Sequence, residues 1–175
     1  MSQTKKVTLS AMMVALGTVF MVIGAVFEVM DLTVCAMASL LVVFVYIEIG
    51  SYYPWLVWIC TSLATLLLYP GSLIGWEYFL VFGIYPLIKA YIERLPRWSW
   101  LIVKVAYINA VIWSLYLVCE LLLKIPFFSM EEGIVLLVIT YILTNIAFVA
   151  FDFFISVMVR FYFERLRPKI KKFLK

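Results

Sequence analysis

The chain has 175 residues and a formal net charge of +4; 67% of its residues are hydrophobic, 18% aromatic and only 14% charged. An ordinary soluble domain is about half apolar and about a quarter charged, so this composition excludes a soluble globule, and its high hydrophobicity also excludes a disordered chain. We therefore expect one lipid-embedded bundle that takes in residues 1–175 as a single domain.

Six apolar stretches have the continuity of membrane-spanning helices, which need about 20 mostly apolar residues. Continuous apolar runs favour helices over barrel strands, in which apolar and polar residues alternate. In chain order the predicted spans are Thr8–Glu28, Thr33–Ile49, Tyr53–Tyr69, Glu77–Ile92, Trp98–Leu123 and Gly133–Tyr162. The sequence thus predicts an all-α polytopic membrane protein with six transmembrane helices in one bundle.

Basic residues sort to one side of these spans. If the N-terminus is inside, 13 of the 14 Lys and Arg residues lie on the inner side and Lys124 alone lies on the outer side. Basic residues concentrate on cytoplasmic loops, so both termini are predicted to be cytoplasmic. The basic tail Arg165–Lys172 fits contact with anionic membrane lipid and gives no reason to expect nucleic acid.

The residues used in most kinds of catalysis are absent from the sequence. It contains no His, and its three cysteines, Cys35, Cys60 and Cys119, lie in separate spans without paired spacing. It also has no Gly-rich phosphate loop that ends in Lys-Ser or Lys-Thr. We expect no enzymatic activity, no metal and no cofactor, and any energised work would depend on partner proteins.

Polar and aromatic residues recur at helical spacing in three spans, and each set falls on one helical face. Such stripes either pack helices together or enclose a site that stacks a ring and hydrogen-bonds its edges. The three stripes are Tyr78, Phe82, Tyr85 and Lys89; Asn109, Trp113, Tyr116 and Glu120; and Tyr141, Asn145, Phe148 and Asp152, with Thr144 beside the last set.

From these stripes and the outer side of the bundle we predict seven substrate-binding residues. In the predicted site Trp113 and Tyr116 stack on a ring, while carboxylates accept hydrogen bonds or balance a positive charge. The full set is Trp76, Glu77, Trp113, Tyr116, Glu120, Tyr141 and Asn145. Because the outer side carries several carboxylates and only Lys124 opposes them, a neutral or cationic ring ligand is favoured over a dianion.

A second polar set lies toward the cytoplasmic side and comprises Glu48, Lys89, Lys104 and Asp152. Opposite charges at similar depth neutralise one another, so an ion pair such as Glu48–Lys89 is favoured over a proton relay, although both interpretations stay open. Pro86 and Gly83 predict a kink in the fourth span just outside Lys89.

The first span begins Lys6-Val-Thr-Leu-Ser-Ala-Met-Met-Val-Ala15-Leu-Gly, and a later stretch reads Phe82-Gly-Ile-Tyr-Pro-Leu-Ile-Lys-Ala-Tyr-Ile-Glu-Arg. These stretches and the whole topology resemble the substrate-binding S components of energy-coupling factor (ECF) transporters, in particular a bacterial branch of that group. The resemblance implies uptake of a vitamin or similar small organic molecule from outside, across a bacterial cell membrane. It also implies a transmembrane coupling subunit, which docks at Ala11 and Ala15, and two ATPase subunits.

The alternative is a scaffold of the bacterial envelope that does not transport, similar to the small membrane subunit of the rod-shape elongation machinery. Such a protein is also compact, apolar and free of catalytic motifs. In that case the polar stripes are packing surfaces and the loops face protein partners.

The basic-residue distribution makes a topology prediction. In a variant without the native cysteines, Arg97→Cys should be inaccessible to an impermeant thiol reagent added to intact cells, whereas Lys124→Cys should be labelled. Labelling at position 97 from outside would contradict the predicted orientation.

Overall fold

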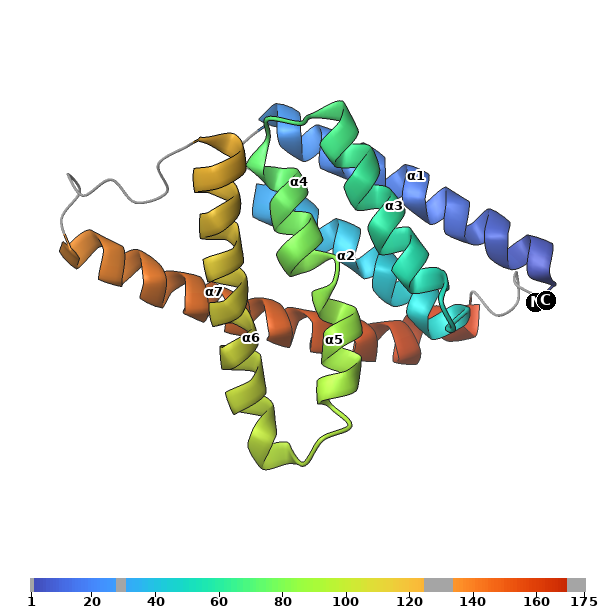
Figure 1. Cartoon of the computed structure of the whole chain (residues 1–175). Coiled ribbons are helices and arrows are strands. Elements are labelled where there is room, and N and C mark those ends of the chain that lie inside the picture. Colours follow the sequence, from blue (N-terminus) through green and yellow to red (C-terminus); the bar gives the residue numbers. More distant parts are fainter. Residues whose placement is uncertain (1, 28–30, 125–133, 170–175) are drawn as a thin grey trace.

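The computed structural model describes residues 2–27, 31–124 and 134–169, and these ranges contain helices and connecting turns but no strand. Figure 1 shows their arrangement in one bundle. In chain order the elements are α1 (Gln3–Phe27), α2 (Asp31–Glu48), α3 (Tyr53–Leu68), α4 (Leu73–Glu77), η1 (Tyr78–Phe82), α5 (Tyr85–Ile92), α6 (Arg97–Leu117), η2 (Val118–Leu123), α7 (Ile134–Phe161) and η4 (Tyr162–Leu166), where η marks a short π-helical segment. The predicted all-α class is confirmed.

Five helical segments are long and apolar enough to cross a membrane, and the 16-residue α3 is a shorter apolar helix. The observed bounds follow the predicted spans, with the largest differences at two starts and at the end of the sixth span, where the helix continues beyond Tyr162 through η4 to Lys169. Helix α1 begins at Gln3 because the polar residues before Thr8 continue the helix beyond the apolar run. The fourth pass begins at Leu73 because the Ser72 hydroxyl accepts a hydrogen bond from the Ile74 N–H and caps it.

Helices α1, α2 and α3 pack closely because small residues lie where they meet. A Cβ added at Gly17 of α1 would lie 3.1 Å from Thr61 Cγ2 of α3, and one added at Gly24 of α1 would lie 3.3 Å from Val34 Cβ of α2. Small residues at such points let helices in lipid approach closely, which is the main source of their packing energy. Met21 and Val42 are fully buried in the resulting core.

The fourth pass is a broken helix. Its backbone changes from α4 to the π-helical η1, in which the Gly83 N–H bonds to the Tyr78 carbonyl at 2.7 Å, and α5 then starts with Pro86 in its first turn. Proline cannot donate the next helical hydrogen bond, and π-turns shift the pairing by one residue. The predicted interruption at Gly83 and Pro86 is therefore confirmed.

Two side chains from neighbouring helices bond to the carbonyls at this break. The Trp58 indole N–H of α3 donates to the Phe79 carbonyl at 3.1 Å, and the Tyr107 hydroxyl of α6 donates to the Leu80 carbonyl at 2.8 Å. Lipid offers no water for an unpaired carbonyl, so a broken transmembrane helix needs such donors from its neighbours. The break is thus stabilised by α3 and α6.

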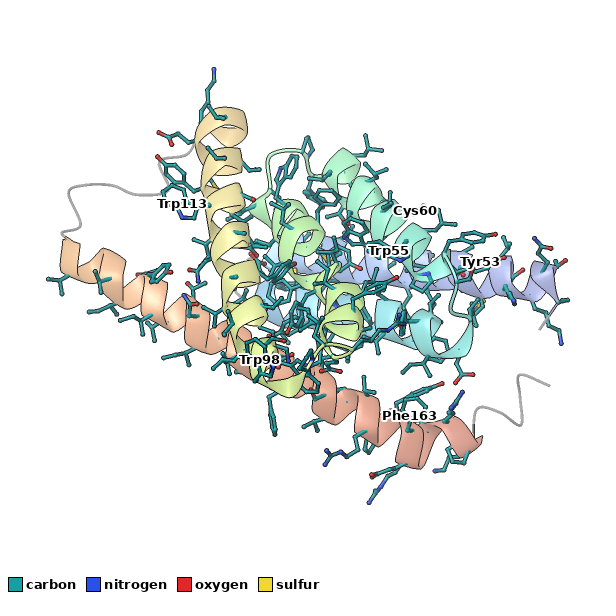
Figure 2. All side chains as sticks on the ribbon, turned by 60° about the horizontal axis from the view of Figure 1, so that its bottom comes forward. Tyr53, Trp55, Cys60, Trp98, Trp113 and Phe163 are labelled. Atoms are coloured by element: carbon teal, nitrogen blue, oxygen red, sulfur yellow. The ribbon has the colours of Figure 1, made fainter. Side chains whose placement is uncertain are left out.

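Helices α6 and α7 cross at a steep angle, and both views show that their outer ends diverge (Figures 1 and 2). Helices α4 and α2 lie beside them on the outer side of this crossing (Figure 1).

Gly83 is expected to be intolerant of a side chain. A Cβ there would lie 2.5 Å from Trp58 Cδ1 and 2.9 Å from the Tyr78 ring. We predict that Gly83→Ala lowers the free energy of unfolding by about 1–3 kcal/mol, as overpacked cores do. Thermal unfolding of the purified protein measures this, with Gly71→Ala as the control because no atom lies within 4 Å of its added Cβ. Equal melting of the two variants would contradict the packing at the break.

Candidate functional site

A cavity of about 600 Å³ lies among α2, α4–η1, α6 and α7, at the point where α6 and α7 diverge. Its volume falls within the range of ligand-binding pockets, roughly 300–1,000 Å³. Fifteen of its twenty lining residues are apolar. The apolar wall includes Met37 of α2, Val81 of η1, Ile108 and Ile112 of α6, and Ala147 and Phe154 of α7.

The polar groups of the wall lie toward its outer end. Thr33 stands in the first turn of α2 and Glu77 at the end of the short α4, while Tyr141 and Thr144 are in the outer half of α7. The inner wall residues of the same helices are aliphatic or aromatic. The cavity is therefore amphipathic, with a polar rim and an apolar interior.

Three phenylalanines lie together in the inner part of the wall: Phe82, Phe148 and Phe151, which we call the aromatic floor. The ring centroids of Phe82 and Phe151 lie 4.8 Å apart in edge-to-face geometry. Tyr85 packs beneath them, with its ring 4.6 Å from Phe148. Edge-to-face aromatic pairs at these distances contribute packing energy beyond their buried area, so the floor is a rigid boundary.

Immediately inside the floor lies a charge cluster of Lys89, Glu93, Lys104 and Asp152. The Asp152 carboxylate accepts hydrogen bonds from the Lys89 ammonium, from the Lys104 ammonium at 2.7 Å and from the Tyr85 hydroxyl at 2.6 Å. Glu93 lies 3.5 Å from the Lys89 ammonium and 3.9 Å from that of Lys104. Two ammonium groups thus face two carboxylates, and the cluster is formally neutral.

The cluster corrects one expectation from the sequence, because the predicted Glu48–Lys89 ion pair is wrong. Lys89 pairs with Asp152, whereas Glu48 accepts hydrogen bonds from Arg167 Nε at 3.0 Å and from the Tyr162 hydroxyl at 3.1 Å. Charge pattern gives the depth of a residue but not which helices are neighbours. Here η4 lies against the inner end of α2, and α5 lies against α7.

The structure brings two of the seven predicted substrate-binding residues, Glu77 and Tyr141, into the cavity wall. The Tyr141 hydroxyl also donates a hydrogen bond to the side-chain carbonyl of Asn109 on α6. Within the described ranges Glu77 forms no hydrogen bond and no ion pair.

The other five predicted residues lie outside the wall. Trp113 is 68% exposed and directed to the side of α6 away from α4, and its ring packs edge-on against Tyr116 (Figure 2). Glu120 is exposed. Asn145 donates to the Tyr141 carbonyl at 3.0 Å within α7, and Trp76 packs edge-on against Phe79. A ligand role for these five residues stays a prediction.

The sequence stripes located the site only partly. The stripes of the fourth and sixth spans supply Phe82, Tyr141 and Phe148, but the stripe of the fifth span lies on a different face of α6, whose cavity wall is aliphatic. The contribution of α2, through Thr33 and Met37, was missed because these residues form no distinctive pattern. Only the packing of α2 beside α7 identifies them.

Ala11 and Ala15 are both exposed on α1, whereas Ser10, Gly17, Met21 and Gly24 form its buried face. The two alanines are therefore accessible to another helix in the membrane rather than packed inside this chain. Docking of a partner at this position remains a prediction.

Comparison with protein-family models, with curated proteins and with solved structures finds no match to this chain.

Asp152 is expected to be essential for stability. Asp152→Asn leaves two mostly buried ammonium groups without the central carboxylate, and breaking a buried ion pair costs about 3–5 kcal/mol. Glu93→Gln is the control: its longer, half-exposed contacts predict a loss below about 1 kcal/mol. Thermal unfolding in detergent compares the two. If Asp152→Asn melts with the parent protein, the cluster does not hold the bundle together.

Proposed function

We propose that this chain binds a small organic molecule in the cavity and serves as the substrate-binding membrane subunit of an ECF-type uptake transporter. The observation that carries the proposal is the cavity itself, which has the volume of a ligand pocket, a polar rim at its outer end and an aromatic inner end. A site of this shape captures a molecule from the outer side and retains it at the aromatic floor.

The arrangement of the inner half supports a role in capture rather than free passage. The aromatic floor and the charge cluster separate the cavity from the cytoplasmic ends of the helices. Release to the inside therefore requires a rearrangement of helices, and the chain itself has no phosphate-binding loop to drive one. Separate ATPase subunits, coupled through a membrane partner, are the proposed source of energy.

The exposed alanines of α1 give that membrane partner a place to dock. Ala11 and Ala15 lie one helical turn apart on the accessible face, and small residues at this spacing allow close approach of a second helix. This support is independent of the cavity, because α1 contributes no residue to its wall.

Retention of a ligand tests the binding role. We predict that native mass spectrometry of the purified protein detects a bound small molecule and that Ala147→Phe, which fills the cavity, removes it. Ala106→Phe is the matched control, because Ala106 is exposed on α6 outside the wall. A molecule retained equally by both folded variants would place the site elsewhere.

Docking is tested by co-purification from native membranes. Ala15→Trp should reduce recovery of ATPase subunits about tenfold, a change equivalent to about 1.4 kcal/mol, while the isolated protein keeps its melting temperature. Ala110→Trp, at an exposed position of α6, should leave recovery unchanged. Co-purification of cell-wall proteins in place of ATPases would favour the scaffold interpretation.

A further inference from the structure

The chemistry of the cavity defines the class of molecule that fits it, and this inference rests on the proposed binding function. The wall has one carboxylate, Glu77, and no Lys or Arg among its lining residues. The other polar groups of the wall are the hydroxyls of Tyr141 and of the threonines at its outer end. One ionic contact and a large apolar surface therefore describe the binding environment.

Glu77 requires a partner in this setting. It is partly buried at the end of α4, and the described residues give it no hydrogen bond or ion pair. A carboxylate removed from water without a partner is costly, whereas an ammonium within hydrogen-bond distance compensates the charge. A positively charged N–H donor is the partner that would compensate this carboxylate best, and no wall residue supplies one.

The apolar part of the cavity indicates what the rest of the ligand is. The wall changes from polar at Glu77 and Tyr141 to aromatic at Phe82, Phe148 and Phe151 as it runs inward. A ligand seated with its charged end at the rim directs its other end at the aromatic floor. Burial there stabilises hydrocarbon and disfavours further polar groups that would be left unpaired.

The same walls show where such a molecule enters. The inner end of α2 contacts η4, the segment that continues α7: the rings of Phe44 and Tyr162 lie 5.7 Å apart, and the Tyr162 hydroxyl donates to Glu48. The outer halves diverge (Figure 1), and their wall residues Leu32 and Tyr141 are 59% and 48% exposed. The described part of the cavity is thus accessible from the lipid side between these halves.

We infer that the ligand is a membrane-soluble amphiphile with a single ammonium head bound by Glu77 and a hydrocarbon body against Phe82, Phe148 and Phe151, entering sideways from the outer leaflet between α2 and α7.

The test uses the full-length protein in lipid nanodiscs with two matched probes, 4-pentylphenethylamine, which is an ammonium, and 3-(4-pentylphenyl)propionic acid, which is a carboxylate. Binding is measured by equilibrium dialysis, and partition into empty nanodiscs is subtracted. We expect saturable binding of the ammonium probe at least tenfold tighter than that of the carboxylate probe.

Three variants assign the contacts. Glu77→Gln should weaken binding of the ammonium probe at least tenfold, whereas Glu164→Gln, an exposed carboxylate at the inner end, should not change it. Ala147→Phe should abolish saturable binding, with Ala150→Phe as a second cavity-filling variant if the first does not fold.

The outcomes separate this inference from the proposed function. If the carboxylate probe binds as tightly as the ammonium, if Glu77→Gln has no effect, or if the parent protein shows no saturable binding of the ammonium probe, the inference is wrong. A small molecule retained in native mass spectrometry and lost from Ala147→Phe would in each of these cases still support the proposed function. Probe binding that survives both cavity-filling variants would overturn the site itself.

Discussion

The carboxylate of Asp152 joins three membrane-embedded segments at one point, and the arrangement of the outer half depends on this junction. Through Lys89, Lys104 and Tyr85 it ties α7 to α5 and α6. A buried charge is tolerated in lipid only when it is paired, so α6 and α7 are fixed where these groups meet. Because the two helices cross steeply there, their outer ends separate, and the separation is the origin of the cavity (Figure 1).

A second constraint is that backbone N–H and C=O groups in lipid need hydrogen-bond partners within the protein. This constraint shapes the part of the cavity wall formed by α4 and η1. The break between α4 and α5 exposes carbonyls that Trp58 and Tyr107 satisfy from two different helices. The π-helical η1 at this break carries Phe82 into the aromatic floor and follows directly after Glu77. The end of α4 therefore supplies the carboxylate of the rim and η1 supplies part of the aromatic floor. This irregular stretch is tolerated because its backbone is buried in protein.

The sequence predicted the helical class and the positions of the passes because these depend on local features, namely the length of each apolar stretch and the turn residues between the stretches. It also predicted the break, since Gly83 and Pro86 have direct backbone consequences. It could not predict which helices are neighbours, and the wrong Glu48–Lys89 pair reflects this limit. For the same reason the sequence placed the fifth-span stripe around Trp113 in the binding site, although this stripe lies on a face of α6 outside the cavity wall. Glu77 and Tyr141, which the sequence also predicted, do line the wall.

The central claim is that the cavity selects one kind of small molecule rather than accepting bulk lipid, and site-specific photo-crosslinking in cells tests it most directly. A diazirine-bearing aliphatic amino acid is placed at position 144, where Thr144 lines the cavity, or at position 146, where Ile146 is 59% exposed outside the wall. The account predicts that mass spectrometry of the irradiated protein finds one distinct small-molecule adduct at position 144 and only bulk phospholipid adducts at position 146. Identical phospholipid adducts at both positions would contradict it.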